Sequence, residues 1–190
     1  MAHKGPITWV SVAVTLAAAA ALLTGCSTAG AAGNAAVTSS LTLAETKSPA
    51  QLLRNTVITR LSPDKYSSHA LNQDASVGCG LDDKIRYWKS SVVFNVDENQ
   101  EYNIKDTVIG LAKTFTADGW QDLIQDTPDI YTVTLHKQGI SSVMVFTAKQ
   151  ATTASGIRTG GQITIEVDGP CVKTDGPFSK EVETLEGKLP

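Results

Sequence analysis

The thiols of three cysteines, Cys26, Cys79 and Cys171, are the side chains of this sequence with the most distinctive chemistry. A cysteine can act as a nucleophile, a metal ligand, a site of modification or half of a disulfide. None of the three lies in a C-x-x-C unit, the spacing of redox and zinc motifs. The role of each cysteine therefore depends on whether the chain leaves the cytoplasm.

An apolar segment at residues 7–23 decides that question. It follows Lys4 and contains 17 residues, many of them alanine. A membrane-spanning helix needs about 20 strongly apolar residues, so this segment is more typical of a secretory signal. We therefore predict that residues 1–25 are a signal peptide and that the rest of the chain lies outside the cytoplasm. The alternative is an uncleaved signal anchor with an incidental cysteine.

The end of this segment, Leu23, Thr24, Gly25 and Cys26, resembles a bacterial lipobox, in which a branched residue and two small residues precede a cysteine. The resemblance implies cleavage between Gly25 and Cys26 and attachment of a diacylglyceryl group to Cys26. Two or more acyl chains anchor a protein stably, because each buried methylene contributes about 0.8 kcal/mol. We therefore expect a lipid-anchored protein on the extracytoplasmic side of the cell membrane.

The two remaining cysteines, Cys79 and Cys171, are expected to form a disulfide, because a lone pair outside the cytoplasm usually oxidises. Each lies in a turn-like stretch, "GCG" at 78–80 and "GPC" at 169–171. The bridge would close a loop of nearly 100 residues, for which the chain-entropy model assigns about 4.7 kcal/mol. The alternative is a reactive thiol or a pair of metal ligands.

No other residues have the spacing of a known catalytic or metal motif. His69 and His136 remain after the signal is removed, and neither has a second ligand at helical or hairpin spacing. Ser62 and Lys65 match S-x-x-K in form, but the S-D-N and K-T-G partners are missing and Pro63 favours a helix-ending turn. We therefore expect no catalytic residue, no metal and no cofactor.

The charged residues give no sign of nucleic acid binding. The chain has 19 acidic and 16 basic residues and no basic patch. The pair Asp82 and Asp83 is interpreted as solvated turn residues. A calcium site is conceivable in the next acidic turn but lacks the spacing and central glycine of a calcium loop. Its residues would be Asp97, Glu98, Asn99 and Glu101.

Hydrophobic periodicity predicts two helices. The first is expected to begin at Ser48, followed by Pro49, and to end at Pro63. The second is expected to begin at Asn103, its N-cap, and to end at Gly119. The predicted buried stripes are Leu52, Leu53, Val57, Ile58 and Leu61 in the first helix, and Ile104, Val108, Leu111, Ala112 and Phe115 in the second.

Alternating and β-branched stretches predict strands. They lie at 86–96, 120–124, 130–137, 140–149 and 162–169, and residues 62–83 are expected to form a loop. This order predicts an α+β fold, a two-layer sandwich of a mostly antiparallel sheet of four or five strands covered on one face by two helices. The domain is expected to span 48–178, after a flexible tether at 26–47 and before a loose tail at 179–190.

Five aromatic residues could line a groove but are more often core: Tyr87, Trp88, Trp120, Tyr131 and Phe146. Tyr87 and Trp88 would point to opposite faces of a regular strand, so one of them should be exposed. That exposed ring is the only hint of a binding face in the sequence.

Together, the lipobox, the small-residue tether, the helix ending in "ADGW" and the strand closing on "GPCV" resemble small secreted lipoproteins of actinobacteria. The resemblance implies location and architecture and no chemistry. We therefore expect a non-catalytic module that binds an envelope protein or a cell-wall component, held on the membrane by the lipid on Cys26. The alternatives are a carrier of a small apolar molecule between sheet and helices, and an envelope enzyme of unrecognised type.

Overall fold

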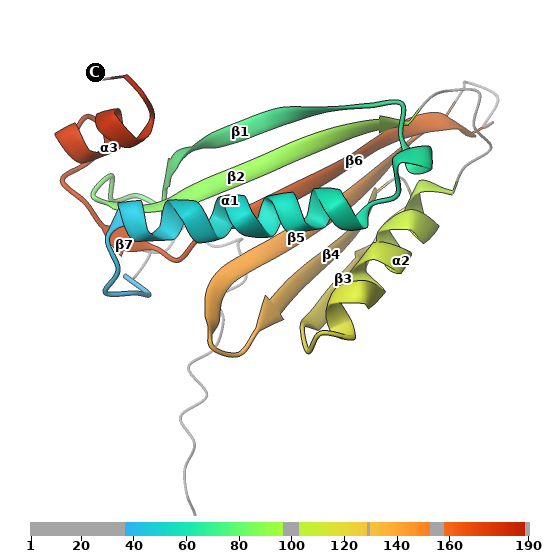
Figure 1. Ribbon diagram of the computed structural model, residues 1–190, viewed down its shortest axis with the longest axis horizontal. Coiled ribbons are helices and arrows are strands. Elements are labelled where there is room, and N and C mark those ends of the chain that lie inside the picture. The colour runs from blue at the N-terminus through green and yellow to red at the C-terminus, as the bar shows by residue number, and fades with distance from the viewer. Residues whose placement is uncertain (1–36, 97–102, 129, 153–157, 189–190) are drawn as a thin grey trace, which may run out of the picture. The chain divides into compact units, whose positions relative to one another are not determined.

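A computed structural model describes residues 37–96, 103–128, 130–152 and 158–188. These residues form an α+β fold with an antiparallel sheet and one disulfide (Figure 1). They belong to one compact unit, Ala32–Pro190. The helices are α1 (Leu43–Arg60), α2 (Ile104–Thr116) and α3 (Lys180–Leu185), with a short 3-10 turn, η1 (Pro63–Lys65). The strands are β1 (Ser68–Gly78), β2 (Ile85–Val96), β3 (Gln121–Asp126), β4 (Ile130–Lys137), β5 (Ile140–Thr152), β6 (Arg158–Asp168) and β7 (Val172–Lys173).

The sheet places strands side by side that are far apart in the chain. Its order is β1-β2-β6-β5-β4-β3, and β7 pairs with the start of β2. All the pairings are antiparallel. The five predicted strands are confirmed as β2 to β6, and the sheet of seven strands is larger than predicted because β1 and β7 join it.

The expected loop at 62–83 is wrong over half of its length, because β1 occupies Ser68–Gly78. This strand is an edge strand that pairs only with β2. The first five residues of β1 are all exposed, so this part of the strand has no buried face and no alternating apolar pattern in its sequence. Backbone hydrogen bonding to β2, rather than burial of side chains, forms this strand.

The predicted start of the first helix at Ser48 is also wrong, because α1 begins at Leu43. Thr42 is the N-cap: its hydroxyl accepts from Glu45 N at 3.4 Å, and its own N–H donates to the Glu45 carboxylate at 2.7 Å. This capping box satisfies two free N–H groups reciprocally. The predicted burial of Leu52 is also wrong, because this side chain is 68% exposed. The buried residues of α1 are Leu43, Thr46, Ala50 and Val57.

Helix α2 forms as predicted, because the signals that begin and end it are local. The Asn103 side chain accepts from Asp106 N, and the five predicted apolar residues are buried. At the other end, Gly119 has φ 86°, in the left-handed region that glycine tolerates. Trp120 N then donates to Phe115 O at 3.1 Å, which is the six-to-one bond of a Schellman motif.

Both long helices lie on the same side of the sheet in Figure 1. Helix α1 contacts β2 and β6, while α2 contacts β4 and β5. Large side chains fill the space beneath them, among them Trp88, Phe94, Phe115 and Phe146, none more than 2% exposed. The opposite side of the sheet, which we call the open face, carries no helix within the described residues. It consists of the side chains of β1 to β6 that alternate with those pointing to the core.

The C-terminal segment 179–190, which we expected to be loosely held, contains α3. Val182 of this helix is buried in the core. Just after the helix, the Glu186 carboxylate accepts from both the N–H (3.0 Å) and the hydroxyl (2.8 Å) of Ser76 on β1. Lys47 of α1 donates to Leu185 O. These contacts join α3 to β1 and α1.

Candidate functional site

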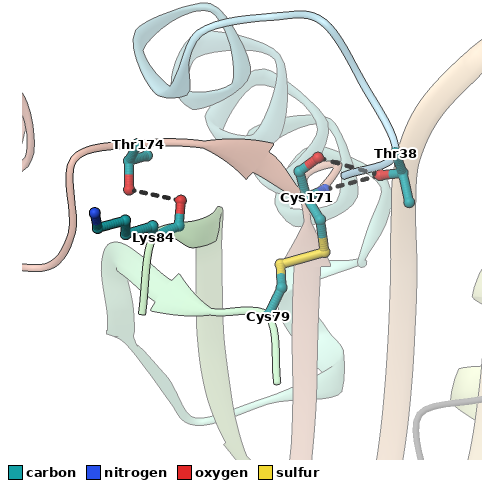
Figure 2. The surroundings of a disulfide bond; sticks show 5 residues. All are labelled: Thr38, Cys79, Lys84, Cys171 and Thr174. Atoms are coloured by element: carbon teal, nitrogen blue, oxygen red, sulfur yellow. Dashed lines mark hydrogen bonds between the residues drawn. A yellow bond between two sulfur atoms is a disulfide. The ribbon is translucent and has the colours of Figure 1, made fainter. Parts of the chain in front are cut away.

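The predicted disulfide is confirmed: Cys79, just after β1, is bonded to Cys171, just before β7 (Figure 2). The backbone of Cys171 also binds Thr38, whose N–H donates to Cys171 O at 2.9 Å. In return, Cys171 N donates to the Thr38 hydroxyl at 3.0 Å. Nearby, Lys84 O accepts from Thr174 N at 2.7 Å and from the Thr174 hydroxyl at 3.2 Å, the second of which is drawn in Figure 2. The disulfide region therefore joins three segments that are distant in the sequence.

Two of the predicted sites lie outside the described residues. The first is the lipobox with Cys26, and the second is the acidic turn with Asp97, Glu98, Asn99 and Glu101. The other acidic pair lies in a turn as expected, where Asp82 accepts from Lys84 N at 2.9 Å. No helix in the described part of the chain has the length and apolar character needed to cross a membrane.

The two histidines lie on different strands. His69 on β1 stacks against the Phe94 ring, with centroids 5.4 Å apart. His136 on β4 lies 3.1 Å from the side-chain oxygen of Gln121, measured from Nε2. Within the described ranges, no three of the residue types His, Cys, Asp and Glu come together as a metal site would require.

The S-x-x-K segment forms the expected turn, in which Lys65 N donates to Ser62 O at 3.0 Å. Both residues line a cleft of about 420 Å³ between the end of α1 and helix α2. Arg60, also in its lining, binds Asp118 at 2.6 Å and lies over the Phe115 ring at 4.2 Å. The described cations of this cleft are thus engaged with the protein itself, since Lys65 also contacts Asp64 at 3.4 Å.

Four of the five aromatic candidates are core residues: Trp88, Trp120, Tyr131 and Phe146 are buried. Tyr87 is half-buried and lies on the open face, opposite in direction to Trp88. The prediction that these two neighbours point to different faces is therefore confirmed, and Tyr87 is the more exposed of the two.

Beside Tyr87, a charged cluster occupies the open face where β2 pairs with β6. Lys89 lies directly opposite Asp168 in the register. The Lys89 ammonium is 2.7 Å from the Glu166 carboxylate and 3.9 Å from Asp168 Oδ1. Its side chain is only 16% exposed, and that of Asp168 is 29% exposed. Asp168 Oδ1 is itself buried without a hydrogen-bond partner among the described residues.

Burial and charge shift the protonation of this cluster. Burial raises the pKa of the Asp168 carboxyl to about 6, the charge of Lys89 opposes the rise, and the charge of Glu166 adds to it. Burial lowers the pKa of Lys89, but the hydrogen bond that Lys89 donates to Glu166 and the charges of Asp168 and Glu166 outweigh it, so the net shift is upward. The pKa of Tyr87 is raised, first by burial and then by Asp168. At neutral pH the cluster thus offers an ammonium, a phenol O–H and carboxylate acceptors.

Sequence reasoning missed this cluster, although part of its signal was visible. The alternation in β2 and β6 places Lys89, Glu166 and Asp168 on the polar face of each strand. What the sequence does not contain is the pairing of β2 with β6, because about 60 residues and four other elements separate the two strands.

Away from this cluster, the open face carries cross-strand rows of uncharged side chains, which are hydroxyl-bearing or aliphatic and β-branched. One row runs through Val93, Thr164, Thr147 and Thr132, which are paired in the register across β2, β6, β5 and β4. The hydroxyls of Thr132 and Thr147 lie 3.4 Å apart. Such a surface can form hydrogen bonds and apolar contacts.

Comparison of the chain with protein-family models, curated proteins and solved structures gave no match.

Proposed function

We propose that the chain is an exported, lipid-anchored protein of the cell envelope, and that its domain is a non-catalytic binding module whose partner contacts the open face of the sheet. In this proposal α1 and α2 cover one side of a two-layer sandwich, and the partner covers the other. Export and anchoring are supported by the lipobox at Leu23 to Cys26 and by the Cys79–Cys171 disulfide, which is typical of an oxidising compartment.

The observation that carries the binding role is the open face itself. A sheet needs cover on one face for its core. In this proposal the helices supply that cover, which is supported by the contacts of α1 with β2 and β6 and of α2 with β4 and β5. The other face presents Tyr87, the Lys89 cluster and rows of threonine and valine without a helix over them in the described chain. Mixed polar and apolar surfaces with an amphipathic aromatic residue are typical of protein interfaces.

The carrier alternative has less support from the described residues. The space between sheet and helices is filled by buried side chains such as Trp88, Phe94 and Met144. The cleft of about 420 Å³ lies between the two helices instead, and Arg60, Lys65 and Asp106 line it. Apolar residues such as Leu61 and Leu111 line this cleft as well, but it does not lie between sheet and helices, where the carrier alternative places its cargo.

A photo-crosslinking experiment in intact cells tests the proposed binding face. Benzoylphenylalanine replaces Tyr87 on the open face in one variant and Leu52, which is 68% exposed on α1, in a control variant. We expect a discrete adduct from position 87 and none from position 52. Adducts of equal yield at both positions, or none at position 87, would contradict the proposed face.

The anchor is tested separately on the same protein. Metabolic labelling with an alkyne-bearing palmitate should mark the wild-type chain, and the mass of its N-terminal peptide should begin at an acylated Cys26. The Cys26→Ala variant should lose both the label and the cleavage. A wild-type chain that keeps Met1 would rule out the proposed processing.

A further inference from the structure

We propose that the end of the domain that carries the disulfide contacts the lipid bilayer directly, through the exposed side chains of Leu81 and Phe178. This inference rests on the proposed lipid anchor, which brings the domain to the membrane. It goes beyond the anchor because it gives the folded domain a membrane-contacting surface of its own.

The two residues are the most exposed large apolar side chains in the described part of the chain. Phe178 is 85% exposed and Leu81 is 75% exposed. Two more exposed apolar residues, Val37 (46%) and Leu41 (40%), lie in the segment that leads into α1. Soluble domains expose single apolar residues freely, but several at one end of a fold indicate a contact with another surface.

Bonds between distant segments place these residues at the same end of the domain. Leu81 follows Cys79 by two positions, and Phe178 lies seven positions after Cys171, so the disulfide joins their two segments. Val37 precedes Thr38, which is hydrogen-bonded to Cys171. Figure 2 shows the three segments converging on the disulfide. In Figure 1 the start of α1, β7 and the connection to α3 lie together at the left.

Leu81 and Phe178 both lie in turns that are closed by backbone hydrogen bonds. Gly80 has φ 87°, and the turn after it is closed by bonds from Cys79 N to Ile85 O (2.7 Å) and from Ile85 N to Asp82 O (3.0 Å). Gly176 has φ 103°, and Ser179 N donates to its carbonyl at 3.3 Å. A surface whose turns are already formed loses little conformational entropy on contact.

The length of the chain keeps this end near the membrane. Only 11 residues separate Cys26 from Thr38. Fully extended, that segment reaches about 40 Å, and a flexible chain of this length averages roughly 20 Å. The anchored chain therefore enters the domain beside Cys171, and the disulfide end is the part of the fold that most readily meets the bilayer.

Charge near the two residues favours an apolar contact over attraction to anionic headgroups. The flanking stretches 82–84 and 173–180 contain three lysines, Lys84, Lys173 and Lys180, and three aspartates, Asp82, Asp83 and Asp175. A neutral flank gives no electrostatic gain on an anionic surface, in contrast to a polybasic segment. The surface should thus contact zwitterionic lipid as well as anionic lipid.

Quenching by brominated lipid tests the contact. The full-length chain, as purified from membranes, is reconstituted into phosphatidylcholine vesicles with bromine on the acyl chains. The Phe178→Trp variant is compared with a Leu52→Trp control, whose site is exposed on α1. The native Trp88 and Trp120 are buried and supply the background. Because side chains at the headgroup boundary reach the acyl region, we expect quenching of the added indole at position 178 to exceed the control by about twofold or more.

The outcomes separate this inference from the proposed anchor. Quenching at position 178 no stronger than at position 52 overturns the contact, even if mass spectrometry of the same sample shows an acylated Cys26. Selective quenching at position 178 supports the contact whether or not Cys26 is acylated. Quenching that appears only after phosphatidylglycerol is added would overturn the apolar mode. The Leu81→Trp variant repeats the test on the second turn, with the same expected result.

Discussion

Replacing Asp168 with asparagine should stabilise the protein at alkaline pH, although it removes a charge that faces a lysine. Burial raises the pKa of Asp168 to about 6 from an ordinary value of 3.8. The native state therefore binds this proton more tightly than the unfolded state. Between these two pH values the wild-type protein loses stability as the pH rises, because the unfolded chain ionises first.

The size of the effect follows from the shift. The difference between about 6 and 3.8 is roughly 2 pH units, which corresponds to about 3 kcal/mol at 1.36 kcal/mol per unit. Water reaches the 29% of the Asp168 side chain that is exposed, so screening reduces this to about 1–3 kcal/mol. Asparagine has the shape of the acid and never ionises. The Asp168→Asn variant should therefore gain that stability at pH 8 and almost none at pH 3.5.

Urea unfolding followed by tryptophan fluorescence measures the difference at both pH values. Glu166→Gln is the matched control, because Glu166 is the close partner of Lys89 at 2.7 Å. That variant should be destabilised at pH 8, the opposite sign. The reasoning is refuted if Asp168→Asn is no more stable than wild type at pH 8, or if its gain is equal at pH 8 and pH 3.5.

Three further predictions concern stability. The Cys79→Ala, Cys171→Ala double variant should lose about 4.6 kcal/mol in urea unfolding, since the bridge spans 92 residues; a loss below about 1 kcal/mol would contradict the loop-closure account. Asp74→Ala should lower the free energy of unfolding by about 2–4 kcal/mol. The indole N–H of buried Trp88 donates to Asp74 at 2.8 Å and would lose its acceptor. A neutral effect on the urea midpoint would show that water replaces the carboxylate. Thr42→Ala should cost about 0.5–2 kcal/mol and leave the unfolding slope unchanged, and an unaltered midpoint would mean that the capping box at Glu45 is not what begins α1.

The elements that could be predicted from the sequence are those with local signals. Helix α2 has its N-cap at Asn103, its stop at Gly119 and a clear apolar stripe between them, so both of its ends and its buried face follow from nearby residues. Strand β4 likewise shows a strict alternation over Ile130–Lys137 and forms with those bounds. The disulfide was predictable because counting left a single pair once Cys26 was assigned to the lipobox.

The elements that could not be predicted depend on distant partners. Strand β1 is stabilised by the backbone of β2 and has a polar sequence, so no periodicity marks it. The start of α1 was placed too late, because Pro49 was interpreted as a first-turn residue although the helix tolerates it in the interior. The charged cluster required the contact between Lys89 and Asp168, which forms only when β6 returns across the sheet to β2.

Under the lipid anchor proposed above, the joining of Thr38 to Cys171 has a mechanical consequence. A pull on the N-terminal segment meets three hydrogen bonds between Thr38 and Cys171 before it reaches the first turn of α1. Because Cys171 is covalently linked to Cys79, the force passes at once into the ends of β1 and β7 instead of peeling the helix from its N-cap. The sheet therefore bears the tension, and α1 stays packed against the core when the N-terminal segment is pulled.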